Sequence, residues 1–109
     1  MNNKIELYTS RAVEYEINNI PDNDKRRQVE DLYDALELQS IPYTYELDAR
    51  EEELEEYNIH YMDAYHIAYA ESCNIDYFIT VDKQLITASK RVNLNIKVIN
   101  PIEFIMEVI

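Results

Sequence analysis

The chain has 109 residues, with 10 basic and 22 acidic side chains and a formal net charge of −12. This length fits one domain over residues 1–109, and an apolar content of 47% is ordinary for a folded protein. The chain contains no glycine, which excludes the Walker loop, the dinucleotide-binding turn and the nucleophile elbow, because each needs glycine where the backbone turns tightly. The single cysteine, Cys73, excludes an internal disulfide and a cysteine-cluster zinc site.

Charge and hydropathy also restrict the partners. The negative charge argues against a general nucleic-acid coat protein that binds through phosphate contacts. No apolar run approaches the roughly 18 residues of a membrane span, and no signal peptide opens the chain. We therefore expect a cytoplasmic protein that does not contact membranes.

Strands and helices alternate in the predicted order. We expect a strand at 5–8, and Ser10 is placed to cap a helix that reaches about residue 19. Apolar side chains at i, i+3, i+4 and i+7 predict an amphipathic helix over 24–38. The remaining elements are a strand at 41–45, a polar helix at 47–57, an apolar helix at 62–73, a strand at 77–81 with both faces covered, a helix at 82–91, a strand at 96–99 and a helix that begins at Pro101. Such alternation predicts an α/β fold with a parallel sheet.

Two further patterns have ordinary structural explanations. Residues 46–56 carry seven acids against Arg50 alone, which is typical of a solvated helix face. Tyrosines recur every four residues at Tyr57, Tyr61, Tyr65 and Tyr69. A base-stacking platform is one interpretation of this stripe, but it points away from Asp63, so helix packing or a subunit interface is favoured.

Three carboxylates lie at positions where active sites form in α/β folds. Asp82 follows the 77–81 strand, Asp63 opens the apolar helix, and Glu16 lies in the helix after the first strand. If they converge, oxygen ligands of this kind suit Mg²⁺ or Mn²⁺. From spacing alone, helix caps are the favoured explanation of Asp63 and Asp82, because aspartate is a preferred N-cap residue, and Glu16 can be a surface residue.

Four segments resemble PIN-domain nucleases of the toxin–antitoxin type. They are Ser10 with the Glu16-Ile17 pair six residues later, DAYHIA at 63–68, DYFITVD at 76–82 and IKVINP at 96–101. The resemblance implies a three-layer fold with a parallel sheet of about four strands. It also implies that Glu16, Asp63 and Asp82 are catalytic metal ligands, with Glu14 as the alternative to Glu16. Thr80 and Ser10 would support this site.

His66 lies one turn from Asp63 and roughly 60° around the helix, so it can reach the margin of such a site. The alternative is a histidine that is packed and hydrogen-bonded beneath the sheet edge. The resemblance does not choose between the two.

The chain departs from the family pattern at its front. Family members open with an apolar strand that ends in an aspartate, and this chain begins with MNNK at 1–4 instead. We therefore expect the central strand and one acidic ligand of the family to be missing. Two strand edges would then lack backbone partners, which predicts a homo-oligomer, most simply a two-fold dimer.

The resemblance implies an endoribonuclease that depends on Mg²⁺ or Mn²⁺, acts on RNA and can be the toxin of a toxin–antitoxin pair. We expect the isolated chain to have weak or no activity. Its partners would be an antitoxin or a complementary N-terminal segment. The alternative is a catalytically inactive PIN remnant, or half of a split domain, that acts as a binding protein.

Overall fold

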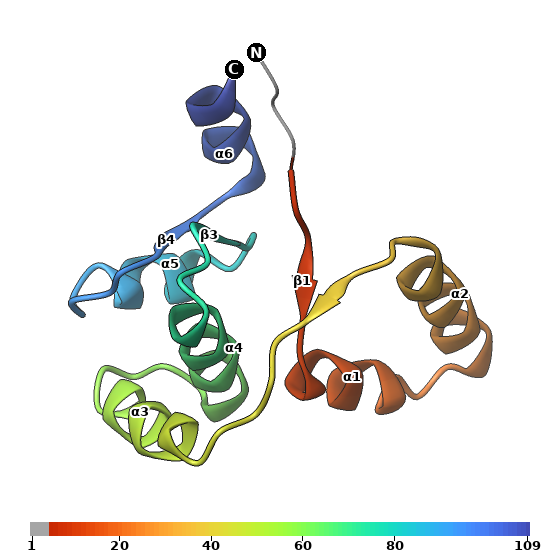
Figure 1. Ribbon diagram of the computed structural model, residues 1–109, viewed down its shortest axis with the longest axis horizontal. Coiled ribbons are helices and arrows are strands. Elements are labelled where there is room, and N and C mark those ends of the chain that lie inside the picture. Colours follow the sequence, from red (N-terminus) through yellow and green to blue (C-terminus); the bar gives the residue numbers. More distant parts are fainter. Residues whose placement is uncertain (1–4) are drawn as a thin grey trace. The chain divides into compact units, whose positions relative to one another are not determined.

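The computed structural model describes residues 5–109, which divide after Tyr43 into two units. The first unit is a helical hairpin between two short parallel strands (Figure 1). Its elements are β1 (Tyr8–Thr9), α1 (Arg11–Asn18), α2 (Asn23–Ala35) and β2 (Gln39–Ser40). In the pairing of the strands, Tyr8 lies opposite Gln39 and Thr9 lies opposite Ser40. This is a strand–helix–helix–strand crossover, which is the connection that parallel strands require.

Local chemistry sets the limits of the first unit's elements. Ser10 is the N-cap residue of α1, as expected, although its side chain makes no capping hydrogen bond. Asp22 caps α2 by accepting hydrogen bonds from the backbone amides of Asp24 and Lys25. The strand predicted at 41–45 lies at Gln39–Ser40 instead. The last bond of this ladder runs from the amide of Ile41 to the carbonyl of Thr9, because α1 begins at Arg11 and the first strand offers no further extended partner.

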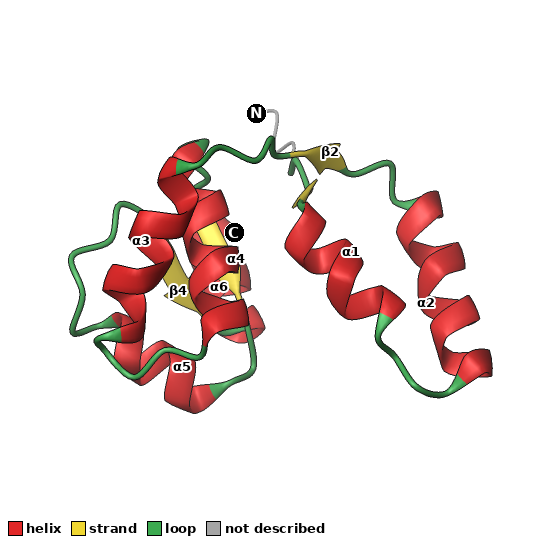
Figure 2. Cartoon of the chain, turned by 90° about the horizontal axis from the view of Figure 1, so that it is seen from below, coloured by secondary structure: helices red, strands yellow, loops and turns green. Residues whose placement is uncertain are grey.

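The second unit holds most of the buried apolar side chains. Its elements are α3 (Glu46–Glu55), α4 (Tyr61–Ser72), β3 (Tyr77–Ile79), α5 (Lys83–Ser89), β4 (Lys97–Ile99) and α6 (Pro101–Val108). Strands β3 and β4 are parallel, with Phe78 opposite Val98. Helices dominate both units, and the strands are short (Figure 2).

The core of the second unit lies between α3, α4, α5 and β4. Leu54 of α3 and Ile67 of α4 are fully buried, and they belong to one cluster with Leu85 of α5 and Val98 of β4. Helix α6 packs on β3 through the rings of Tyr77 and Phe104, whose centroids are 5.0 Å apart. Helices therefore pack on parallel strands, and the fold is α/β.

The expected single sheet is not confirmed. In residues 5–109, β1 pairs with β2 and β3 pairs with β4, so there are two separate two-stranded parallel sheets. A single sheet of about four strands, and a single domain over the whole chain, stay predictions. The prediction that 77–81 is covered on both faces is wrong, since Ile79 is 43% and Val81 is 80% exposed. The strand stops at Ile79, and Val81 lies in the turn that leads to α5.

Candidate functional site

Asp82 lies directly after β3 and is the N-cap residue of α5. Its Oδ1 accepts hydrogen bonds from the backbone amides of Gln84 at 3.0 Å and Leu85 at 3.1 Å. Thr80 Oγ1 accepts a hydrogen bond from the backbone amide of Asp82 at 3.1 Å, which holds the turn between strand and helix. The cap interpretation of Asp82 is therefore confirmed. Both capping bonds go to Oδ1 of this exposed side chain, so capping does not use Oδ2.

Asp63 is not a helix cap. The N-cap residue of α4 is His60, whose Nδ1 accepts a hydrogen bond from the amide of Met62 at 3.3 Å. Asp63 is the third residue of the helix and is half-buried. The cap interpretation fails here because His60 has the extended backbone and the acceptor that a helix start requires.

The start of α4 and the end of β3 lie at the same end of the second unit. A short connection joins the end of α4 to the start of β3, so the two elements run in opposite directions. The rings of His66 and Phe78 are 6.1 Å apart, which sets the first two turns of α4 beside the middle of β3. Asp63 precedes His66 by one turn, and Asp82 follows Phe78. Asp63 and Asp82 therefore lie toward the carboxyl end of the strand, where ligands bind in α/β folds, and their joint use as ligands stays a prediction.

Glu16 and its alternative, Glu14, both lie in α1 of the first unit. Glu14 accepts a hydrogen bond from the hydroxyl of Tyr33 on α2 at 3.1 Å, whereas Glu16 is exposed. Because these two glutamates belong to the first unit, their convergence with Asp63 and Asp82 stays a prediction. Among residues 5–109, no group of three or more His, Cys, Asp or Glu side chains could hold a metal ion.

The donors at the candidate site suit a hard divalent cation. Asp63 and Asp82 offer carboxylate oxygens, which are the ligands that Mg²⁺ and Mn²⁺ prefer. The fit of Asp82 rests on its geometry, since both capping bonds go to Oδ1 and the residue is exposed just after β3. Two carboxylates are a partial donor set for such an ion.

Two tyrosines of α4, Tyr65 and Tyr69, take part in packing. Tyr65 donates a hydrogen bond from its hydroxyl to Oδ1 of Asp48 on α3 at 2.7 Å, and Tyr69 is 4% exposed. These two tyrosines pack within the second unit, as the helix-packing interpretation predicted. Tyr61 is 44% exposed and lies at the start of the same helix.

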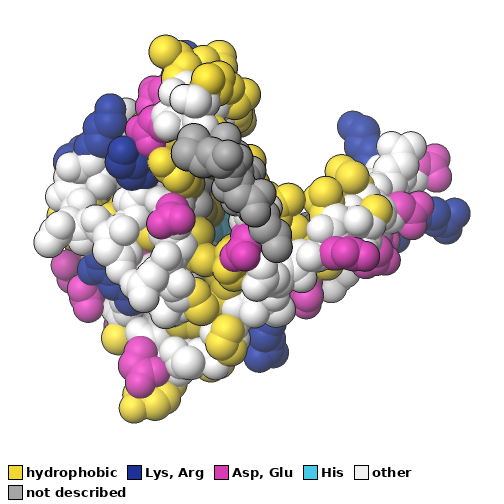
Figure 3. Space-filling model, turned by 45° about the horizontal axis from the view of Figure 1, so that its top comes forward, with side chains coloured by type: hydrophobic (Ala, Val, Ile, Leu, Met, Phe, Trp, Pro, Cys, Tyr) yellow, Lys and Arg dark blue, Asp and Glu magenta, His cyan; other side chains and the backbone are white. Residues whose placement is uncertain are grey.

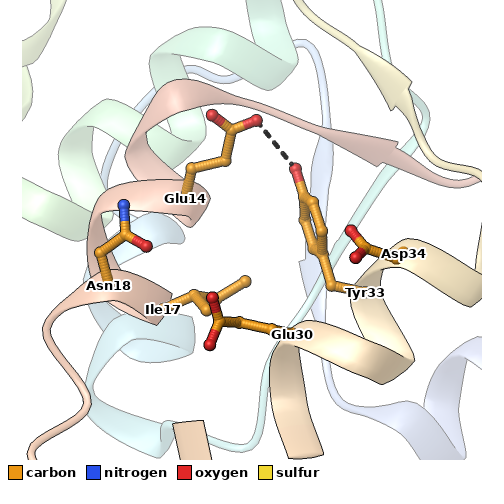
Figure 4. A pocket seen from close by; sticks show the side chains of 6 residues that line it. All are labelled: Glu14, Ile17, Asn18, Glu30, Tyr33 and Asp34. Carbon is orange, nitrogen blue, oxygen red and sulfur yellow. Dashed lines mark hydrogen bonds between the residues drawn. The ribbon is translucent and has the colours of Figure 1, made fainter. Parts of the chain in front are cut away.

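The first unit contains an acidic pocket of about 200 Å³ between α1 and α2. Its lining residues are Glu14, Ile17, Asn18, Glu30, Tyr33 and Asp34 (Figure 4). Three of the six are carboxylates, so the pocket is negatively charged.

The sequence analysis missed one unusual side chain, Glu51 of α3. It is 6% exposed, and burial, followed by a hydrogen bond with Glu55, raises its pKa to about 7. A signal was available in the spacing, because Leu47, Glu51 and Leu54 follow the i, i+4, i+7 pattern of one helix face. The acidic run is thus not solvated throughout.

The chain was compared with known proteins. The family model of the PIN domain matches residues 1–91, which is most of the chain. No match is found among curated proteins or among solved structures. In the part of the chain that the structure describes, no helix has the length and apolar character needed to cross a membrane. PIN domains belong to a superfamily of nucleases that generally use a divalent metal ion. Because this family model covers most of the chain, we conclude that the chain belongs to the PIN domain family.

Proposed function

We propose that the protein is a metal-dependent endoribonuclease that hydrolyses RNA phosphodiester bonds. The observation that supports this proposal most strongly is the position of Asp63 and Asp82 at the carboxyl end of β3 in a chain of the PIN family. Glu16 is the proposed third acidic ligand. Mg²⁺ or Mn²⁺ is the proposed cofactor, and it supplies activation of a water molecule and neutralisation of phosphate charge.

The chain's own residues prepare this site. Thr80 fixes the backbone of Asp82, and the two amides of the first turn of α5 fix Oδ1 of its carboxylate. A carboxylate that is held in place loses little conformational freedom when it binds a cation. His66 is restrained by packing against Phe78, so it is proposed to support the position of α4 rather than to transfer protons.

Cleavage of a fluorogenic single-stranded RNA tests the proposal. We expect weak cleavage in the isolated chain, which requires Mg²⁺ or Mn²⁺, stops with a chelator, and is lost in Asp63→Asn and in Asp82→Asn. The matched control is Asp76→Asn, because Asp76 is exposed and precedes the opposite end of β3. Cleavage that survives in both site variants would contradict the assignment. A wild-type chain that binds RNA or protein without cleaving RNA would favour the alternative, a non-catalytic binding protein.

We also propose that the protein associates with a second copy of itself through α6. Ile102, Ile105, Met106 and Ile109 follow the i, i+3, i+4, i+7 pattern and are 71%, 53%, 73% and 93% exposed. Hydrophobic side chains gather over α6 at the top of Figure 3. Residues 82–109 carry four basic and three acidic side chains, so two copies can approach here without the repulsion that a charge of −12 produces elsewhere.

A toxin role with an antitoxin partner, and a cytoplasmic location, belong to the same proposal. The resemblance of residues 63–68 and 76–82 to toxin-type PIN nucleases supports both. Co-purification of a tagged chain with its neighbouring gene product, together with growth arrest on induction, would test the toxin role. Normal growth at high expression would count against it.

A further inference from the structure

Glu51 occupies a core position in the face of α3 that packs against α4. Its neighbours on this face, Leu47 and Leu54, are 3% and 0% exposed, and Leu54 belongs to the cluster that includes Ile67 of α4. Glu51 itself is 6% exposed. A carboxyl group in such a place is stable when it is protonated and hydrogen-bonded, because a buried charge is costly.

Acidic groups of α3 surround this carboxyl group. Its hydrogen-bond partner is Glu55, one turn further along the helix, and Glu52 and Asp48 add negative charge nearby. Burial is the largest cause that raises the pKa of Glu51 to about 7, and the hydrogen bond with Glu55 is the next. Below this pH the Glu51 carboxyl keeps its proton and donates a hydrogen bond to Glu55.

The other charged groups at the interface have partners of their own. Arg50 binds Glu71 of α4 with its Nε at 2.8 Å and Glu53 with its Nη1 at 3.0 Å. From α4, Tyr65 donates its hydroxyl proton to Asp48 at 2.7 Å. The remaining titratable groups of α4 are Tyr69, which is 4% exposed, His66, whose ring lies 6.1 Å from that of Phe78, and Tyr61 and Asp63 in the first turn.

We propose that protonation of Glu51 controls the docking of α3 on α4. While it is protonated, Glu51 stays in the interface and shares its proton with Glu55. When it loses that proton, two neighbouring carboxylates repel each other one turn apart, and the charge favours water over the interface. Glu51 then leaves the interface, and α3 loosens from α4. This loosening occurs around neutral pH, so the packing of α3 depends on pH in that range.

The sign and size of the effect follow from linkage. Glu51 ionises near pH 7 while α3 is docked and at its ordinary value of 4.5 when α3 is released. Raising the pH through this window therefore favours release, and release becomes about tenfold more favourable at pH 8 than at pH 6. Well above the pKa that Glu51 has in the docked state, a further rise in pH no longer favours release of α3.

Hydrogen exchange of the full chain tests this proposal. It is read by mass spectrometry on peptides covering 46–55 and corrected for intrinsic exchange rates. We expect the protection of α3 to fall about tenfold between pH 6 and pH 8. Glu51→Gln should abolish this fall, because an amide stays neutral throughout. The control Glu56→Gln, an exposed glutamate directly after α3, should retain it.

A second variant keeps the test decisive if Glu51→Gln folds poorly. Glu55→Gln removes the charge that opposes ionisation of Glu51, so the midpoint of the fall in protection should move to lower pH. Protection of α3 that is equal at pH 6 and pH 8 in the wild-type chain would overturn the proposal. A fall that persists unchanged in Glu51→Gln, or a midpoint unmoved in Glu55→Gln, would do the same.

Discussion

Arg50 and Glu71 form a two-point ion pair that joins α3 to α4. Nε of Arg50 lies 2.8 Å from Oε1 of Glu71, and Nη2 lies 3.2 Å from Oε2. The same Nη2 donates to the carbonyl oxygen of Asn93 at 3.2 Å, which extends the link to the segment before β4. The side chains of Arg50 and Glu71 are 28% and 13% exposed, so water screens this pair only in part.

Replacing Arg50 with lysine is expected to destabilise the second unit by about 1–3 kcal/mol. Lysine keeps the charge but presents one point donor instead of a planar fork, so Glu71 and the Asn93 carbonyl cannot both be satisfied. Urea unfolding followed by tyrosine fluorescence measures the change. Arg91→Lys, at an exposed position, is the control, and an equal loss in both variants would contradict this role of Arg50.

Two substitutions of Asp82 are expected to differ in their effect on stability but to agree in their effect on metal binding. Asp82→Ala should lower the free energy of unfolding by about 1 kcal/mol, because two amides of α5 lose their acceptor. Asp82→Asn should change it by only a few tenths, since asparagine also caps helices. Calorimetry should show loss of Mn²⁺ binding in both variants. Unchanged Mn²⁺ affinity in Asp82→Asn would remove Asp82 from the proposed site.

The pair formed by Lys97 and Glu107 predicts a pH effect. The hydrogen bond from Lys97, followed by that from the Tyr77 hydroxyl, holds the pKa of Glu107 below its ordinary 4.5. The stabilising contribution of this carboxylate is therefore present above pH 4.5 and is lost as the pH falls through its lowered pKa. Lys97→Met should return the pKa of Glu107 toward 4.5, which carboxyl-carbon NMR titration would show. Lys83→Met, an exposed control, should leave that titration as it is.

The proposed dimer should depend on the apolar stripe of α6. Ile105→Glu together with Met106→Glu is expected to convert a dimer into a monomer, because each change places a charge in the contact. Light scattering on an analytical gel-filtration column gives the mass. Leu32→Glu, at an exposed apolar position in the first unit, should leave the dimer intact. A wild-type chain that is monomeric at micromolar concentration would contradict the proposal.

The first unit should depend on the hydroxyl of Tyr33. It donates to Glu14 at 3.1 Å and lies 3.0 Å from Oγ1 of Thr9, so it joins α2 to α1 and to β1. Tyr33→Phe is expected to cost about 1 kcal/mol, seen as faster hydrogen exchange in residues 11–18. Tyr15→Phe is the matched control, because Tyr15 is 55% exposed. Equal exchange in the wild-type chain and Tyr33→Phe would show that this hydroxyl is dispensable.

Much of the candidate site could be predicted from short patterns. Asp82 follows an apolar run and begins a helix, so both its position after β3 and its capping role were readable. Asp63 was correctly placed in the first turn of α4, but its cap interpretation was wrong, because an unexpected residue, His60, takes the N-cap position. The sequence correctly placed Glu16 on α1. No local pattern predicts which residues from distant parts of the chain lie near it.

The sequence by itself determined the order of helices and strands, since periodicity and capping operate within one or two turns. It did not determine where strands end or what they pair with, because a ladder depends on a partner far along the chain. The strand expected at 41–45 thus lies at Gln39–Ser40, opposite β1. Only the tertiary structure decided the state of Glu51. A glutamate in an acidic helix reads as solvated until the packing of α3 on α4 removes water from one face, and burial then raises its pKa to about 7.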